Sequence, residues 1–121
     1  MARLGELERQ VMEILWGGFG TELSGREVAA QLPGHAYTTV LTVLGRLERK
    51  GLVLRERRRT SHRYSAVASR EAFVAELMHE ALDATPDRDA ALVRFAETVT
   101  GDEARVLLDA LDRSKPAKRS R

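Results

Sequence analysis

Hydroxyl and guanidinium groups gather on one face of a helix that the apolar spacing predicts from about Ala36 to Lys50. The apolar residues of this helix bury one face, so at about 100° per residue the polar groups fall opposite or beside it. Threonine can contact a base edge, a thymine methyl group or a phosphate, and arginine is the commonest bidentate reader of guanine. The candidate contacts are Thr38, Thr39, Thr42, Arg46 and Arg49. We therefore predict a nucleic-acid interface here, with a solvated polar helix as the alternative.

Arginines are dense in the following segment, with five between residues 55 and 63. Residues 52–57 and 63–67 have the alternation of two strands, and a basic, polar tip at residues 58–62 separates them. Such a hairpin can lie along or in the minor groove and neutralise phosphates, whereas the alternative is that its charges only keep an edge strand soluble. The candidate contacts are Arg55, Arg57, Arg58, Arg59, His62 and Arg63.

Patterns typical of catalysis are missing from the sequence. It has no glycine-rich phosphate loop, no G-x-S-x-G elbow and no His-Glu-x-x-His helix. Its three histidines, His35, His62 and His79, are scattered, and it has no cysteine. We predict that the protein is not an enzyme, and that it has no catalytic residue, no metal site, no cofactor and no evident small-molecule substrate.

Length and composition limit the fold. A chain of 121 residues with 43% hydrophobic and 31% charged residues can form one ordinary domain or two small ones. A membrane span needs about 18 consecutive apolar residues, and neither such a run nor the apolar stretch of a secretory signal occurs. We therefore expect a cytoplasmic protein.

The charge is distributed unevenly along the chain. Residues 1–67 hold eleven Lys and Arg against seven Asp and Glu, whereas residues 68–113 hold five against eleven. The last eight residues add four basic residues and no acidic ones. This asymmetry indicates that the first half meets a polyanion while the second half has another task.

The predicted elements of the first half are three helices and the hairpin. An apolar stripe from Leu4 to Leu15 predicts the first helix, which Gly17 and Gly18 end. The second opens with a capping box, Ser24-Gly25-Arg26-Glu27, and the third is closed by Gly51. A helix-turn-helix followed by a basic hairpin is a winged helix, in which the second helix of the pair enters the major groove. We assign residues 1–68 to this domain.

Three further helices are predicted in the second half, from Ser69 to about Ala84, after Thr85 as N-cap with Pro86 as first residue, and after the capping box of Thr100. Their apolar stripes exceed what a small winged unit can cover. We therefore predict a mostly helical fold in which residues 69–113 form a homodimer, with packing back as a monomer as the alternative. Residues 114–121 are expected to form a disordered basic tail. The dimerisation residues would be Phe73, Leu77, Leu82, Leu92, Phe95, Val99, Leu107, Leu108 and Leu111.

Four segments carry a resemblance to a known family: LGELERQVMEILW, AYTTVLTVLGRLERKGLV, SHRYSAV and ALVRFAETVTGDEARVLLDAL. Together they resemble the BlaI/MecI/CopY family of bacterial penicillinase-type repressors, from about Leu4 to Asp112. The most specific piece is the Tyr37-Thr38-Thr39-Val40 opening of the third helix, and the resemblance adds Tyr37 to the DNA-binding residues. It implies a homodimeric repressor on a palindromic operator of double-stranded DNA.

The resemblance also implies how repression ends. Similar family members are controlled by a membrane sensor metalloprotease. This protease detects a β-lactam or another envelope signal and cuts the repressor in its dimerisation half. In staphylococcal members the cut falls between Asn and Phe, and the corresponding bond here is Arg94-Phe95. Those members carry Arg at the position of Leu41, so the operator need not be the same. The copper-responsive branch uses a Cys-x-Cys motif, which this sequence lacks.

Two other functions fit the same residues. A non-specific architectural DNA-binding protein would use the same basic surfaces without preferring a sequence. A winged-helix protein-interaction module would turn the Thr and Arg face toward an acidic partner and bind no duplex.

Overall fold

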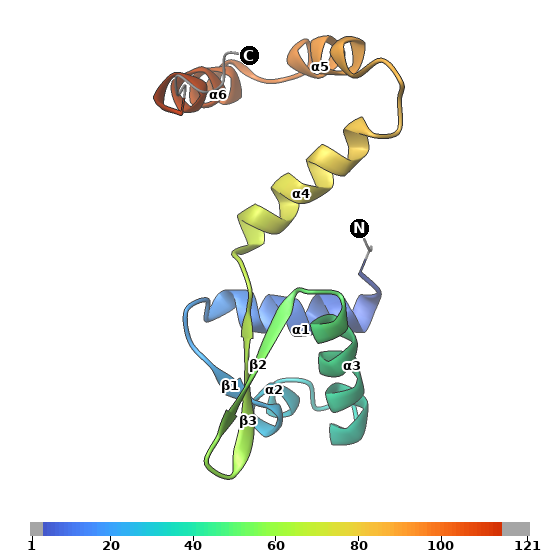
Figure 1. Ribbon diagram of the computed structural model, residues 1–121, viewed down its shortest axis with the longest axis vertical. Coiled ribbons are helices and arrows are strands. Elements are labelled where there is room, and N and C mark those ends of the chain that lie inside the picture. Colours follow the sequence, from blue (N-terminus) through green and yellow to red (C-terminus); the bar gives the residue numbers. More distant parts are fainter. Residues whose placement is uncertain (1–3, 115–121) are drawn as a thin grey trace. The chain divides into compact units, whose positions relative to one another are not determined.

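The computed structural model describes residues 4–114 and divides the chain into two compact units, one ending at Met78 and the other beginning at His79 (Figure 1). The first unit contains helices and a small antiparallel sheet, and the second contains helices. The predicted fold class, mostly helical with a winged helix-turn-helix, is therefore confirmed. Of the predicted basic tail, all but Ser114 lies outside the described residues.

Helix α1 (Glu6–Gly17) forms where the apolar stripe predicts it. The Gly5 backbone N–H at its start donates to Glu8 Oε1 at 2.8 Å, and Gly18 is the C-cap residue after its last turn. The buried side chains on its inner face include Val11, Met12, Leu15 and Trp16.

Helix α2 (Gly25–Ala30) begins with the predicted capping box. The Glu27 backbone N–H donates to Ser24 Oγ at 3.1 Å, and the Ser24 N–H donates to Glu27 Oε1 at 2.8 Å. After a short turn comes α3 (Tyr37–Arg49), which is followed by Gly51 with φ of +82°, a left-handed conformation that favours glycine. The predicted helix-turn-helix is therefore present.

A three-stranded antiparallel sheet follows, with strand order β1-β3-β2. Strands β2 (Val53–Arg58) and β3 (Ser61–Ala66) form the predicted hairpin. Strand β1 (Leu23–Ser24), which pairs with β3, was not predicted from the sequence. Two residues are too few to show the alternation of apolar and polar side chains by which strands are predicted. This segment is a strand only because it pairs with β3, about 40 residues later in the sequence.

The hairpin tip is shorter than predicted. Arg58 pairs with Ser61, so only Arg59 and Thr60 connect the strands, whereas the expected tip spanned residues 58–62. Arg59 turns the chain with φ of +40°. The prediction was wrong because charged residues carry little strand signal, although their backbones pair like any others.

The core of the first unit lies between α1, α2, α3 and the sheet. Its central side chains from the later elements are Val28, Val40, Val43, Leu44, Leu47, Val53 and Tyr64. They bury the apolar faces of the two helices of the helix-turn-helix, which fixes the direction of the opposite, polar face of α3.

Helix α4 (Arg70–Leu82) begins against this core. The Phe73 ring lies 5.3 Å from the Trp16 ring between centroids, and the Trp16 indole N–H donates to the Ala68 carbonyl oxygen at 3.1 Å. The first compact unit therefore continues to Met78, inside α4, whereas the sequence suggested a first domain of residues 1–68.

The second unit holds α5 (Arg88–Ala96). Thr85 does not cap this helix, contrary to the prediction, because the Asp87 side chain accepts from the Ala90 N–H at 3.0 Å. Thr85 Oγ1 instead accepts from the Asp87 N–H at 3.1 Å. Aspartate ranks above threonine as an N-cap, which accounts for the later start.

Helix α6 (Gly101–Arg113) opens with the predicted capping box of Thr100 and Glu103, whose two hydrogen bonds measure 2.9 and 3.1 Å. Between Ser65 and Ser114 no residue is fully buried. Over residues 4–114, no helix combines the length and apolar character that crossing a bilayer demands.

Candidate nucleic-acid interface

Helix α3 presents the predicted polar face to solvent. The side chains that are exposed on it are Thr38, Thr39, Thr42, Arg46 and Arg49. Thr42 Oγ1 donates to the Thr38 carbonyl oxygen at 3.0 Å, which leaves its acceptor lone pairs and its methyl group for a ligand. A methyl group and an acceptor are suited to a base edge in the major groove.

Gly25 sets how closely α2 approaches α3. It is buried, and a Cβ atom there would lie 2.8 Å from Leu41 Cδ2 and 3.5 Å from Tyr37 Cε1. A larger residue at Gly25 would require the Leu41 side chain to move. Tyr37, which the family resemblance placed in the interface, is therefore half-buried against α2, and Leu41 packs against the core instead of standing free.

Arg46 has a partner inside the protein. Its Nη1 atom lies 3.8 Å from Oε2 of Glu8, and Lys50 Nζ lies 2.8 Å from Oε1 of the same carboxylate. The hydrogen bonds from Lys50 and from the Gly5 backbone lower the pKa of the buried Glu8 carboxyl, so it is ionised at neutral pH. Arg46 thus faces solvent beside a fixed negative charge, whereas Arg49 meets no carboxylate among the described residues.

The wing arginines divide into two groups. Arg58 donates to both carboxylate oxygens of Glu22, at 2.5 and 3.2 Å, and Arg63 donates to the Glu22 carbonyl oxygen at 3.2 Å. Arg57 and Arg59 pair with no carboxylate in the part of the chain that the structure describes. In the sequence these four arginines look alike, because the contact between Arg58 and Glu22 spans 36 residues and leaves no local signal.

The two other candidates of the hairpin are less available to a ligand, Arg55 because of an ion pair and His62 because of its burial. Arg55 Nε lies 3.6 Å from Glu48 Oε1, and His62 is half-buried opposite Arg57 in the strand register. Figure 1 shows the hairpin tip and the start of α3 at the end of the first unit remote from α1. The hairpin tip and the first turn of α3 therefore lie at one end of the winged helix, whereas Arg46 and Arg49 lie in the last turn of α3, where Arg46 approaches Glu8 of α1.

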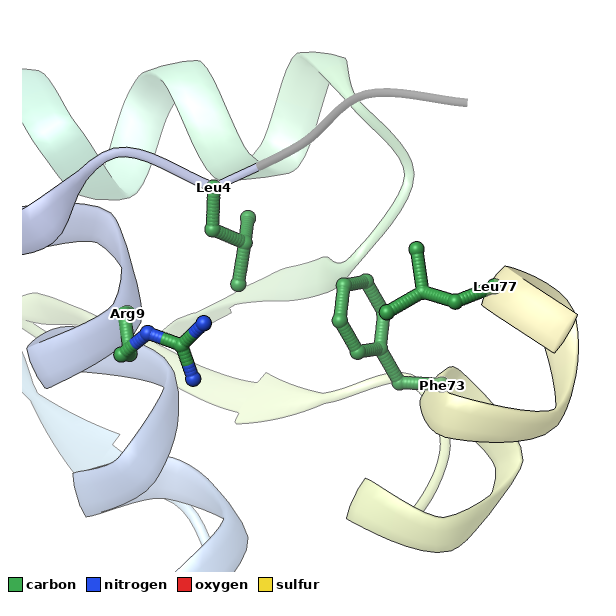
Figure 2. Close-up of a pocket in the computed structure, with 4 residues that line it drawn as sticks. All are labelled: Leu4, Arg9, Phe73 and Leu77. Carbon is green, nitrogen blue, oxygen red and sulfur yellow. The ribbon is translucent and has the colours of Figure 1, made fainter. Parts of the chain in front are cut away.

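A groove of about 480 Å³ lies elsewhere in the first unit, between the start of α1 and the first turns of α4. Figure 2 shows Leu4, Arg9, Phe73 and Leu77 around it. One arginine among apolar side chains offers no acid and base pair for catalysis. Within residues 4–114, no group of three or more His, Asp or Glu side chains could hold a metal ion.

The predicted dimerisation residues fall in both units. Phe73 and Leu77 lie in the first unit, half-buried, and Leu82 and Val99 are half-buried in the second. The others are exposed: Leu92, Phe95, Leu107, Leu108 and Leu111. The Arg94-Phe95 bond lies in the last turn of α5, with both residues exposed.

Comparison with known proteins places this geometry in a family. A family model described as penicillinase repressor matches residues 4–113. The transcriptional regulator BlaI from two Mycobacterium tuberculosis strains, CDC 1551 / Oshkosh and ATCC 25618 / H37Rv, is 46% identical over 117 residues, which cover 92% of this chain and 84% of each relative. A solved structure of a MarR family protein from Bacillus stearothermophilus is similar in fold, with a TM-score of 0.51 at 20% identity over 93% of this chain and 73% of that one.

These matches confirm the resemblance read from the sequence, and with it the expectation that the protein is not an enzyme. The match to residues 4–113 includes both the winged helix and the helices that follow it. The chain belongs to the penicillinase repressor family of transcriptional regulators.

Proposed function

We propose that this regulator is a homodimeric repressor that binds a palindromic operator and excludes polymerase from the promoter it covers. The observation that carries the proposal is the exposed face of α3, where three threonines and Arg49 project from a helix whose opposite face is buried. In a two-fold symmetric dimer, two such helices would enter successive major grooves about 34 Å apart. The relatives named transcriptional regulator BlaI support this proposal.

The second unit supports the homodimer. Its helices α5 and α6 bury no residue in the single chain, although they carry large apolar side chains. Leu108 is 68% exposed and Leu111 is 55% exposed. Isolated helices of this length are marginal in water, so they need a partner surface, and a second copy of the chain supplies one with matching chemistry.

Relief of repression by proteolysis is the second part of the proposal. A membrane-bound sensor metalloprotease that responds to a β-lactam or another envelope signal would cut Arg94-Phe95. The last turn of a short, unburied helix opens at little cost, which gives a protease access to an extended backbone. The proposal places the protein in the cytoplasm, where its operator and the inner side of such a sensor meet.

Co-expression with the cognate protease tests this part. Fragments ending at Arg94, formed only when the inducer is present, are expected. If the protein stays intact when the protease and the inducer are both present, the cleavage proposal is wrong. The DNA-binding proposal would not be affected.

Fluorescence anisotropy tests the DNA-binding proposal. Duplexes that tile the upstream region of the protein's own gene are compared with a scrambled duplex at two salt concentrations. One palindromic tile is expected to bind about a thousandfold more tightly than the scrambled duplex. Arg49→Ala should weaken binding to that tile more than binding to the scrambled duplex, and Arg9→Ala, on an exposed position of α1, serves as the matched control.

Two outcomes would favour the other functions. Equal, steeply salt-dependent binding to every duplex would indicate a non-specific architectural protein. No binding to any duplex would favour a protein-interaction module.

A further inference from the structure

Arg26 is a cation that the predicted interface did not include. It is the second residue of α2, its side chain is exposed, and no carboxylate within residues 4–114 forms an ion pair with it. The acidic residue beside it, Glu27, is already occupied, because it accepts from the Ser24 N–H and lies 3.6 Å from Arg63 Nη1. The charge of Arg26 is therefore available to a ligand, unlike the charge of Arg63.

The guanidinium of Arg26 is held in place by an aromatic ring. Its central carbon lies 4.5 Å from the centroid of the Tyr37 ring, at the start of α3. A guanidinium that stacks on a ring keeps the N–H groups along its edge free to donate, so it loses less conformational freedom when it binds an anion. Tyr37 therefore orients the guanidinium of Arg26 without neutralising its positive charge.

The close contact between α2 and α3 makes this stacking possible. A Cβ atom at Gly25 would lie 3.5 Å from Tyr37 Cε1, an ordinary contact distance, so the Tyr37 ring packs directly against the start of α2. The stacking thus fixes the Arg26 side chain relative to both α2 and α3. Its position relative to the polar face of α3 is set by buried contacts and not by a flexible loop.

We propose that Arg26 binds a backbone phosphate of the DNA next to the bases that α3 reads, with Tyr37 as its positioning residue. The inference rests on the proposed function. In a helix-turn-helix the first helix crosses the sugar-phosphate backbone while the second enters the major groove, so a cation on α2 meets phosphate and not base edges. A planar, doubly donating guanidinium suits a phosphate better than a lysine ammonium does.

The salt dependence of DNA binding separates a phosphate contact from a structural role. Arg26→Ala is expected to weaken binding to the operator tile and to the scrambled duplex by the same factor, and to lower the slope of log K against log salt concentration by about 0.9. Arg9→Ala is the matched control, because Arg9 is exposed on α1 beside the groove of Figure 2 and should leave the slope unchanged. Thermal unfolding of each variant checks that the fold is intact.

Two more variants test the role of the ring. Tyr37→Leu removes the ring on which Arg26 stacks and should weaken binding to both duplexes, without lowering the slope as far as Arg26→Ala does. Tyr37→Phe keeps the ring and should weaken binding less than Tyr37→Leu. Arg26→Lys should keep the slope but lose affinity, because the charge remains and the stacking is lost.

The result that would overturn the inference is an unchanged slope in a folded Arg26→Ala variant, or a loss confined to the operator tile, which would make Arg26 a base reader. If the unaltered protein binds no duplex at all, the proposed function itself fails. The two failures are therefore distinguishable.

Discussion

The carboxylate of Glu8 on α1 accepts two hydrogen bonds from the Lys50 ammonium group at the end of α3, at 2.8 and 2.9 Å. Glu8 is the one charged residue that is buried among the described residues. Because α3 carries the proposed DNA-reading face, this ion pair fixes the C-terminal end of that helix to α1.

Replacing Glu8 should therefore reduce stability in a pH-dependent way. The carboxyl pKa is lowered from its ordinary 4.5 in the folded protein, so its contribution is full above that value and is lost as the pH falls through the lowered pKa. Glu8→Gln should cost about 1–3 kcal/mol at pH 7, and the difference from the unaltered protein should shrink in acid. Urea unfolding followed by the fluorescence of Trp16, the only tryptophan, measures this in the first unit. A difference that stays constant from pH 7 to strongly acidic pH would contradict it.

The same substitution at two glycines should have opposite effects. At Gly45, on the exposed side of α3, a Cβ atom would lie 3.7 Å from Arg49 Nη1, an ordinary contact, so Gly45→Ala should raise stability by about 0.5–1 kcal/mol. At Gly25 it would lie 2.8 Å from Leu41 Cδ2, so Gly25→Ala should cost about 1–3 kcal/mol and weaken DNA binding. Urea unfolding of both variants tests the difference in stability, and anisotropy on Gly25→Ala tests the loss of DNA binding. Equal changes in stability would contradict the prediction.

Arg46→Ala should weaken operator binding by about 1–3 kcal/mol if the side chain reads a base. Its Nη1 atom is 3.8 Å from Glu8, a loose contact that leaves half of the side chain exposed. Binding to the scrambled duplex should change much less. Equal losses on both duplexes would refute the base-reading role.

The division of the wing arginines predicts unequal effects on salt dependence. Removing the two unpaired cations, Arg57 and Arg59, should lower the slope of log K against log salt by about 1.8 if each meets one phosphate. Arg58→Ala should lower it less, because Glu22 already neutralises Arg58. Anisotropy over a salt series compares them, and a larger effect of Arg58→Ala would show that its ion pair opens on DNA.

Local signals in the sequence were enough to predict most helices. The capping boxes at Ser24 and Thr100 lie within four residues each, so their hydrogen bonds form wherever the helix forms. The polar face of α3 was equally readable, since its period depends only on helix geometry. At Thr85 two competent caps lay two residues apart, and the sequence could not rank them without the surrounding chain.

The parts that the sequence did not indicate depend on distant partners. Strand β1 exists because Leu23 pairs with Tyr64, and the arginines of the wing differ because Glu22 reaches Arg58. The stacking of Arg26 on Tyr37 likewise joins two helices through a turn. Each of these contacts joins residues of two different elements, so the periodicity of hydrophobic residues within one helix or strand cannot predict it.

Disrupting the apolar face of α6 should separate the proposed dimer. Leu108→Asp and Leu111→Asp place charges where side chains are 68% and 55% exposed in the single chain, so the folded monomer should tolerate them. Burial against a second copy would leave those charges unpaired, which opposes association. Arg113→Ala, on the same helix, is the matched control and should remain dimeric.

Loss of the dimer should then lower operator affinity by orders of magnitude, because the second half-site is no longer held near the first. The change should be confined to the palindromic duplex, since a single winged helix keeps its own contacts on a half-site duplex. Sedimentation equilibrium gives the oligomeric state, and anisotropy on full and half-site duplexes gives the affinities. A charged variant that stays dimeric would show that α6 is not the interface, and a monomer with undiminished operator binding would show that the two half-sites are not read jointly.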